Sequence, residues 1–302
     1  MKKFIIVIAA VIMALPSFAA DVVKSDRPVT KDYNLKGFYG IDAGSIVEVQ
    51  LTKSETWKVS VTLPEALEDY LDVKMNNGKL SINLRQAPLK IRKNYGTWVV
   101  TATVSMPELR SLNLSGAIKF SCDDSFDLGN GTFKMDLSGA SKAKGLDIIA
   151  KELVMDMGGA ASADLAGDFH VARIEMGGAA KCHFNINADE LDQEISGAAK
   201  AYHSGEFGSI ELEASGAGVF SFTGSAEKIE IEGSGASKIE TSKGKAIAVE
   251  ATLSGATYCE VNALENLKVD ASGGSSLRYV DNDGLNLDIR SINRGSSVTK
   301  MR

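Results

Sequence analysis

The chain has 302 residues, with 33 basic and 39 acidic side chains and a formal net charge of −6. An apolar content of 44% and a charged content of 24% exclude a disordered chain, and this length can bury a large core. The negative charge disfavours binding to nucleic acid. Only three histidines and three cysteines are available for a catalytic or metal centre, so we expect no cofactor.

The N-terminus has the pattern of a secretory signal peptide. Two lysines precede an apolar run over residues 4–15, and Pro16 and small residues through Ala20 follow. This run is shorter than the roughly 20 apolar residues that a membrane-spanning helix needs. We therefore predict removal of residues 1–19. The protein would then be periplasmic, on the outer surface or secreted, and not an integral membrane protein.

Residues 20–107 form a region that differs from the rest of the chain. No proline occurs after residue 107, whereas 24 of the 29 glycines lie after residue 100. Short stretches that alternate apolar and polar residues indicate β-strands, and Pro64–Leu71 suits one helical turn. Asn76-Asn77-Gly78 predicts a turn into a strand over residues 79–84. We expect this β-rich region with one short helix to cap the repeats that follow.

Residues 108–302 repeat a Ser-Gly-Ala-like triplet. The intervals between the middle glycines run from 18 to 23 residues and average just under 20. Such a period is typical of a solenoid, whose units bury their apolar faces by stacking on their neighbours. The ten repeating glycines are Gly116, Gly139, Gly159, Gly178, Gly197, Gly216, Gly235, Gly255, Gly273 and Gly295.

Apolar and polar residues alternate on both sides of each glycine. Around Gly139, for example, the alternation places Met135, Leu137 and Ala143 on one face. This pattern predicts a strand of about six residues that ends in a glycine corner, and a second inward-facing strand after it. The Leu-Asn pattern of leucine-rich repeats and the three similar hexads of a left-handed β-helix are absent. The sequence therefore predicts a right-handed parallel β-helix of about ten coils with roughly 20 residues each.

We expect each repeating glycine to turn a sharp corner. A narrow coil needs a positive φ at its corner, or a side chain small enough for the next coil to pass closely. Glycine meets both requirements without strain.

The cysteines and methionines are interpreted as core residues. Cys182 and Cys259 fall in one inward column four coils apart, or about 19 Å, whereas a disulfide needs Cα atoms within about 7 Å. Cys122 has no obvious partner, so we expect three free thiols. Four methionines take inward positions and would fill the core rather than bind copper: Met135, Met155, Met157 and Met176.

The histidines do not form a recognisable metal site. His170, His183 and His203 stand at different offsets from their nearest repeating glycines. A metal site requires side chains that converge on one point, and these offsets do not bring the three histidines together. We therefore expect all three histidines on the surface or in turns.

Two columns of charged residues would face outward. The acidic file stands three residues before the glycines and consists of Asp136, Asp156, Glu175, Glu194, Glu213, Glu232 and Asp270. The basic file stands three residues after them and consists of Lys119, Lys142, Lys181, Lys200 and Lys238. Both files fit ordinary solvated faces that keep a long sheet soluble. Because like charges about 4.8 Å apart repel, the acidic file is also a weak candidate for binding divalent cations or a basic surface.

No catalytic constellation can be recognised. The sequence offers no set of nucleophile, base and orienting residue. Polysaccharide lyases and hydrolases build a groove from long loops, and the short intervals between the repeats leave almost none. The sequence therefore predicts a protein that is not an enzyme.

Three features of the chain are shared with one known family. They are the stretch FYGIDAGSIVEVQLTKSETWKVSVTLPEALEDYLDVKMNNGKLSINL, the stretch TATVSMPELRSLNLSGAIKF and the Ser-Gly-Ala repeats. In these features the chain resembles the DUF2807 family, the autotransporter adhesins with a head GIN domain that occur in Bacteroidetes. The resemblance implies an exported, β-helical, non-enzymatic protein with an adhesive or surface role. It implies no catalytic residues.

Two hypotheses about function follow. The first is an exported, non-enzymatic adhesin or surface-binding module of the cell envelope, whose extracellular or envelope partner is a protein or a glycan. The alternative is a carbohydrate-binding or carbohydrate-active β-helix. The alternative requires exposed aromatic side chains, and the tyrosines of the repeat region are Tyr202, Tyr258 and Tyr279.

Overall fold

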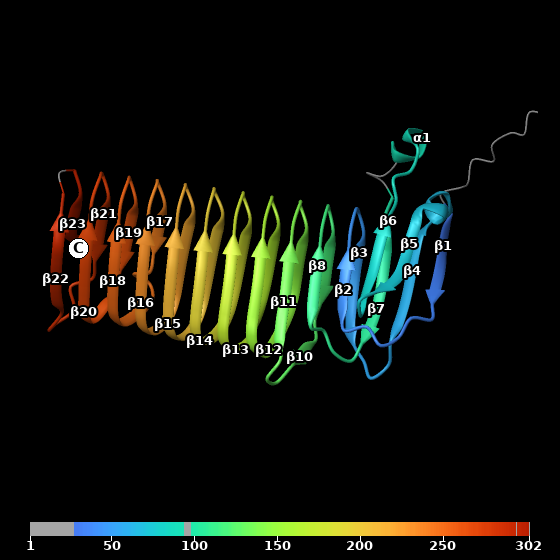
Figure 1. Ribbon diagram of the computed structural model, residues 1–302, viewed down its shortest axis with the longest axis horizontal. Coiled ribbons are helices and arrows are strands. Elements are labelled where there is room, and N and C mark those ends of the chain that lie inside the picture. Colours follow the sequence, from blue (N-terminus) through green and yellow to red (C-terminus); the bar gives the residue numbers. More distant parts are fainter. Residues whose placement is uncertain (1–26, 94–97, 294, 302) are drawn as a thin grey trace, which may run out of the picture.

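The computed structural model describes residues 27–93, 98–293 and 295–301, which form a long rod (Figure 1). The predicted signal peptide, residues 1–19, lies outside the described residues. Most strands pair in parallel with the strand one coil before and one coil after. In Figure 1 the strands nearest the reader run upward while successive coils advance from right to left, which is a right-handed winding. The predicted right-handed parallel β-helix is therefore confirmed.

The repeating part of the rod contains sixteen strands among the described residues. They are β8 (Ser111–Leu114), β9 (Lys119–Cys122), β10 (Ser125–Asp127), β11 (Thr132–Leu137), β12 (Lys142–Met157), β13 (Ser162–Met176), β14 (Lys181–Ile195), β15 (Lys200–Ala214), β16 (Val219–Gly233), β17 (Lys238–Glu240), β18 (Lys245–Leu253), β19 (Tyr258–Val261), β20 (Ala263–Ala271), β21 (Ser276–Tyr279), β22 (Asn286–Ile292) and β23 (Ser297–Lys300).

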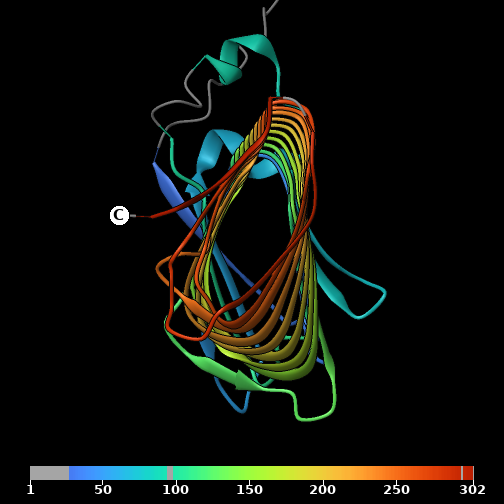
Figure 2. The same cartoon turned by 90° about the vertical axis from the view of Figure 1, so that its left-hand side faces the viewer.

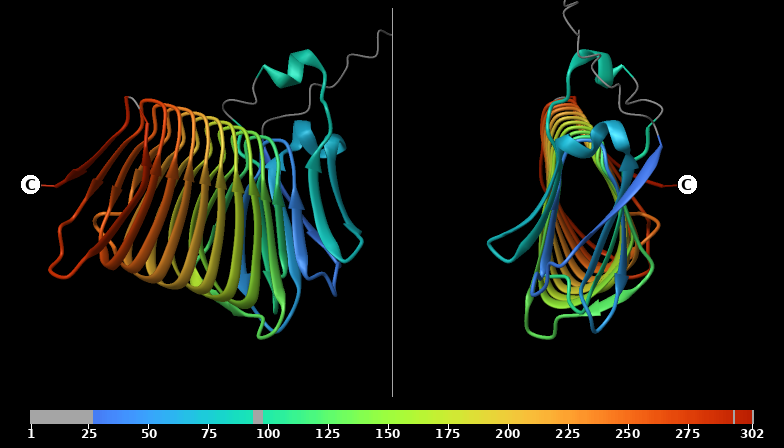
Figure 3. Two further views of the ribbon diagram at one scale, coloured as in Figure 1. Left: turned by 60° about the vertical axis from the view of Figure 1, so that its left-hand side comes forward. Right: turned by 90° about the vertical axis from the view of Figure 1, so that its right-hand side faces the viewer.

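Each coil contributes to two faces of the rod, which we call sheet A and sheet B. Sheet A holds the stretch before each repeating glycine, as in residues 152–157, and sheet B holds the stretch after it, as in residues 162–169. A view along the rod superimposes the coils and shows a tight corner at the top and a wide arc at the bottom (Figure 2). The side views show the same arrangement repeated along the rod (Figure 3).

The longest strands exceed the six residues that the alternation predicted. β12 to β16 hold 15 or 16 residues each, because the chain passes from sheet B through the arc into sheet A as one strand. Gly167, Gly205 and Gly224 lie in this arc with φ of 151°, 142° and 127°. A Cβ added at any of them would lie 1.9 Å from a carbonyl oxygen of the preceding coil. This second glycine column was not predicted from the sequence.

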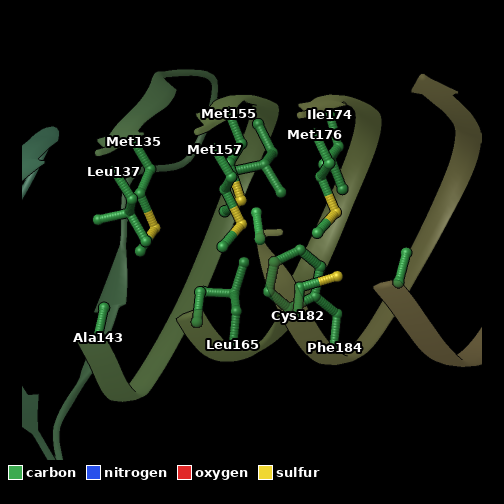
Figure 4. Packing of buried hydrophobic residues seen from close by; sticks show 14 of the residues in the cluster. Met135, Leu137, Ala143, Met155, Met157, Leu165, Ile174, Met176, Cys182 and Phe184 are labelled. Carbon is green, nitrogen blue, oxygen red and sulfur yellow. The ribbon is translucent and has the colours of Figure 1, made fainter. Parts of the chain in front are cut away.

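The core fills the space between sheets A and B. Figure 4 shows side chains of sheet A, including Met135, Met157 and Ile174, pointing toward Leu165 and Phe184 of sheet B. The four methionines assigned to the core are all buried, and so is the predicted column of sheet B that consists of Phe120, Ala143, Ala163, Cys182, Ala201, Phe220, Ile239, Cys259 and Leu277. All three cysteines are free and buried, as predicted.

One histidine contradicts the sequence analysis. His170 and His183 are exposed as expected, but His203 is buried, with 3% of its surface exposed. Its Nε2 lies 3.0 Å from Oε1 of buried Gln193, and its ring contacts the rings of Phe184 and Phe220. The expectation of a surface histidine is wrong here because position 203 continues an inward column, which a scattered offset does not reveal.

The N-terminal end contains the remaining elements. They are β1 (Pro28–Tyr33), β2 (Gly40–Ala43), β3 (Glu48–Lys53), β4 (Lys58–Pro64), the 3₁₀-helix η1 (Glu65–Tyr70), β5 (Leu71–Asn76), β6 (Lys79–Leu84), α1 (Leu89–Arg92) and β7 (Thr101–Met106). The predicted helical turn is therefore present as η1, and the predicted hairpin joins β5 to β6 through Asn77 and Gly78, both with positive φ. The single turn α1 was not predicted.

The first coil in chain order, formed by β2 and β3, is not the outermost coil of the rod. β2 lies between β6 and β8 in sheet A, and β3 lies between β7 and β9 in sheet B. The outermost pairings, β1 with β4, β4 with β7 and β5 with β6, are antiparallel, and Ala66 and Leu67 of η1 are buried. The parallel ladder thus continues across residue 107, and a domain boundary at that position stays a prediction.

Candidate functional site

The ten repeating glycines form one column along the tight corner of the rod. Their φ values lie between 65° and 96°. From Gly139 onward, a Cβ added at each of them would lie 2.6–2.8 Å from the carbonyl oxygen of the preceding glycine of the column. That oxygen accepts a hydrogen bond from the residue after the next glycine, as between Ala198 N and Gly178 O at 2.7 Å. The glycine column therefore serves to stack the coils closely and is not a binding surface.

The acidic file runs along the outer surface of sheet A beside this corner. Its members are in register from coil to coil, with Thr252 in the place between Glu232 and Asp270. Five of them, from Asp156 to Glu232, line a shallow groove of about 500 Å³ next to the glycine column. In four successive coils a second run of carboxylates lies two residues before the file position and consists of Asp192, Glu211, Glu230 and Glu250.

Mutual repulsion and partial burial act on the acidic file. Partial burial, and then the neighbouring charge of Asp156, raise the pKa of Asp136 above its usual range. Loss of solvent, and then the charges of Glu175 and Glu213, raise the pKa of Glu194. Within the described residues none of the seven file members forms an ion pair, whereas Glu230 and Glu250 of the second run do. The file is therefore a strip of uncompensated negative charge.

A metal site is not formed by these side chains. In the described part of the chain, no group of three or more His, Cys, Asp or Glu side chains could hold a metal ion. The in-register file presents its carboxylates side by side, so a cation would meet them from one side. Cation binding by the file stays a prediction, which calcium titration calorimetry would test.

No helix among the described residues is long and apolar enough to cross a membrane.

The basic file lies on the outer surface of sheet B. It is in register but interrupted, because Ser162, Val219 and Tyr258 occupy the equivalent places in three coils. Lys119 and Lys238 form ion pairs with Glu48 and Glu240 at 2.6 Å and 2.8 Å. The two faces of the rod therefore differ in charge.

Sheet B also carries a second groove, which we call the aromatic groove. It has a volume of about 620 Å³ and crosses β12 to β16. Its exposed or half-exposed side chains include Asp164, His183, Asn185, Tyr202, Ser204 and Ser221. This groove was not predicted, although one signal for it is present in the sequence: His183 and Tyr202 lie at the same offset, five residues after Gly178 and Gly197.

The three tyrosines of the repeat region have different surroundings. Tyr202 lies in the aromatic groove and stacks on His183. Tyr258 donates a hydrogen bond to Glu260 and accepts one from Arg278 at 3.3 Å, outside the groove. Tyr279 is half-buried against the end of the core. The structure therefore singles out Tyr202 as the tyrosine with a free position beside its ring.

The most strongly shifted titratable groups are inside the rod. Burial raises the pKa of Cys182 to about 12 and lowers the pKa of His203 to about 3. Perturbed groups of a catalytic site normally open into a cleft. Both side chains here point into the core, so they are structural.

Comparison with known proteins gives one family. The family model DUF2807, described as "Putative auto-transporter adhesin, head GIN domain", matches residues 37–183 and 169–282. No curated protein matches the chain. These matches span both the N-terminal coil and most of the repeats.

The similar solved structures include three from two Parabacteroides species. They are crystal structures of a putative adhesin from Parabacteroides distasonis (TM-score 0.49), a putative adhesin from Parabacteroides merdae (0.47) and a putative lipid binding protein from Parabacteroides distasonis (0.43). Each is 16% identical to this chain. The alignments cover 92%, 91% and 91% of this chain and 98%, 96% and 97% of those chains, respectively.

Proposed function

Because the chain belongs to the DUF2807 family, we propose that it is an exported, non-enzymatic adhesin of the cell envelope, which uses the faces of its rod to bind a surface. The partner is an extracellular or envelope protein or glycan. The observation that carries the proposal is the family match together with two long, uninterrupted outer faces of different charge.

The geometry of the faces supports binding to an extended partner. Coils from β12 to β16 are joined at the corner by only four residues, as in residues 158–161, so no long loop covers either sheet there. Equivalent side chains recur at the strand spacing of about 4.8 Å along the rod. Repeated weak contacts along such a face add up through multivalency.

The distribution of reactive groups supports a role other than catalysis. The strongly shifted thiol and imidazole groups are enclosed in the core, where a substrate cannot reach them. Both outer grooves are shallow: the one on sheet A is lined by carboxylate, hydroxyl and backbone groups together with apolar atoms, and the aromatic groove on sheet B is lined mainly by apolar surface. Binding requires only such a surface, whereas catalysis requires converging groups in defined roles.

Export and surface display can be tested together. The native host is fractionated, the protein is located by immunoblotting, and intact cells are treated with a protease that does not cross the outer membrane. We expect a mature N-terminus close to Ala20 by mass spectrometry and loss of the protein on protease treatment. An uncleaved protein in the cytoplasm, or a protein fully protected in the periplasm, would contradict the proposal.

A further inference from the structure

The aromatic groove contains a rigid platform. The rings of His183 and Tyr202 stack with centroids 5.0 Å apart and an angle of 15° between their planes. Nδ1 of His183 lies 3.3 Å from Oδ1 of Asp164, and Nζ of Lys181 lies 5.4 Å from the centre of the Tyr202 ring. All three supporting residues belong to the two coils before Tyr202. They support the tyrosine ring on the side that faces the preceding coil.

Among the described residues, the only ring that stacks on Tyr202 is that of His183. The next residue in the same column is Ser221, and the one after that is Glu240. With coils about 4.8 Å apart, the small serine leaves a slot about 10 Å long between the tyrosine ring and the glutamate. A ring stacked on an aromatic face needs a separation of about 4 Å, so one ring fits above Ser221.

Polar side chains stand beside this slot, within a groove whose lining is mainly apolar. Ser204 Oγ donates to Asn185 Oδ1 at 3.1 Å, and Thr223 lies beside it in the next coil. The far end carries Glu240, paired with Lys238 at 2.8 Å. Hydroxyl, amide, carboxylate and ammonium groups therefore surround a single aromatic face.

This combination selects the chemistry of the ligand. A hexopyranose ring has an apolar face of C–H groups and a rim of hydroxyls that both donate and accept hydrogen bonds. An aromatic side chain of a protein partner would cover the tyrosine but leave the polar rim of the slot desolvated without hydrogen bonds, which is costly. Ligand sites typically pair an apolar surface with a few placed polar groups.

We propose that the aromatic groove binds a glycan, with one hexose ring stacked on the free face of Tyr202 above Ser221. The inference rests on the proposed function as a surface-binding rod and names the class of partner. The glycan runs along sheet B, where the same polar column continues through Asn185, Ser204 and Thr223. The acidic sheet A is then the face turned away from it.

The test uses the purified protein and defined oligosaccharides. Saturation-transfer difference NMR is run with hexasaccharides of β-1,4-glucose, β-1,4-N-acetylglucosamine, β-1,4-galactose and α-1,6-mannose, and the affinity of each positive probe is measured by calorimetry. We expect at least one to bind with a dissociation constant of about 1 mM or lower. Tyr202→Ala should weaken that binding at least tenfold, a change of about 1.4 kcal/mol.

Two further variants separate stacking from general damage to the protein. Ser221→Phe fills the slot but keeps Tyr202, so it should abolish binding of the same hexasaccharide while far-ultraviolet circular dichroism and melting stay unchanged. Tyr258→Ala removes a tyrosine of the same sheet outside the groove and should bind within about twofold of the unmodified protein.

Several outcomes would overturn the glycan site. They are no saturation transfer to any of the four hexasaccharides, binding that Tyr202→Ala and Ser221→Phe leave unchanged, or an equal loss in Tyr258→Ala. Attachment of protein-coated beads to host-derived surfaces is measured in parallel. If beads coated with Tyr202→Ala attach as well as beads coated with the unmodified protein, the adhesive function is supported and the glycan site is refuted. Failure of all beads to attach removes the adhesive function itself.

Discussion

The corner of the first coil differs from the corners of all later coils. At the N-terminal end the corner residue is Ser45, which has a φ of 73° and a side chain that donates to Leu84 O at 2.9 Å. In each of the ten later coils the same position is glycine. Ser45 is in the column because Ala117 N donates to Ser45 O at 2.7 Å, the bond that links the later pairs of corners from Gly116 to Gly273.

The difference shows which requirement imposes glycine. A left-handed φ alone costs a non-glycine residue roughly 1–2 kcal/mol, which Ser45 tolerates. After β6 the chain leaves the rod toward α1 (Figure 1), so among the described residues no glycine corner of a preceding coil lies beyond Ser45. At Gly116 and beyond, a Cβ would meet the carbonyl oxygen of the preceding corner at 2.5–2.8 Å. The close approach of the preceding coil, more than φ, therefore imposes glycine.

The largest effect is expected from a side chain in the stacked column. Gly197→Val or Gly216→Val places a β-branched side chain at positive φ against backbone, and we expect a loss of about 3 kcal/mol or more in the free energy of unfolding. Urea denaturation measures the loss. The matched control is Gly158→Ala, since Gly158 adjoins a corner glycine but has nothing within 4 Å of an added Cβ. A melting temperature of Gly197→Val within about one degree of the unmodified protein would refute the crowding argument.

A reciprocal exchange at the first two corners tests the comparison directly. Gly116→Ser should cost about 2 kcal/mol or more, because its Cβ would lie 2.5 Å from Ser45 O. Ser45→Gly should change stability by less than about 1 kcal/mol, since relief of strain offsets the loss of one hydrogen bond and the greater freedom of the unfolded chain. Equal losses in the two variants, measured by urea denaturation, would mean that position along the rod does not matter.

Acid should weaken the repeats more than the N-terminal end. Burial lowers the pKa of His203 from 6.5 to about 3, so between these values the unfolded chain binds a proton that the folded chain does not. Stability from His203 is thus complete above pH 6.5 and falls by at most about 1.4 kcal/mol per pH unit as the pH drops toward 3. Hydrogen exchange at about pH 5 should show lost protection around β15 before β2 and β3.

His203→Phe isolates this effect from the acidic file. The raised pKa of Glu194 acts in the opposite sense, because protonation there favours the folded state as the pH falls. Phenylalanine continues the inward column of Phe184 and Phe222, so the variant should fold and lose the acid sensitivity. Exposed His170→Gln serves as the control. An unchanged pH dependence of unfolding in His203→Phe would show that another group is responsible.

The smallest expected effect concerns thiol reactivity. Burial raises the pKa of all three thiols, to about 12 for Cys182, so none should react with Ellman's reagent at about pH 8 while the protein is folded. Unfolding in denaturant without reductant should release three thiols. Cys122, whose coil pairs with β3 at the N-terminal end, should react first on slow opening. Two or fewer thiols after unfolding would contradict free cysteines.

Much of the fold could be predicted because its repeat leaves a periodic signal. The glycine spacing and the alternation around each glycine determine a coil, its corner and its two inward faces. The long strands through the arc were not predicted, because Gly167, Gly205 and Gly224 recur only in some coils. Ile148 and Ile186 occupy the equivalent places in other coils. The burial of His203 was not predicted, because an inward-facing polar residue can be recognised only once its column is aligned with the neighbouring coils.

The sequence by itself determined the parallel coil, the corners, the core columns and the family, whereas the right-handed winding is seen in the structure. A parallel solenoid repeats one local environment, so each position is recorded about ten times in the chain. Only the tertiary structure decided that β2 and β3 insert between β6–β7 and β8–β9, because this threading depends on pairing between residues 39 to 71 positions apart that share no repeat. It also decided that Tyr202 has a free face, which depends on the neighbouring coil carrying serine rather than another ring.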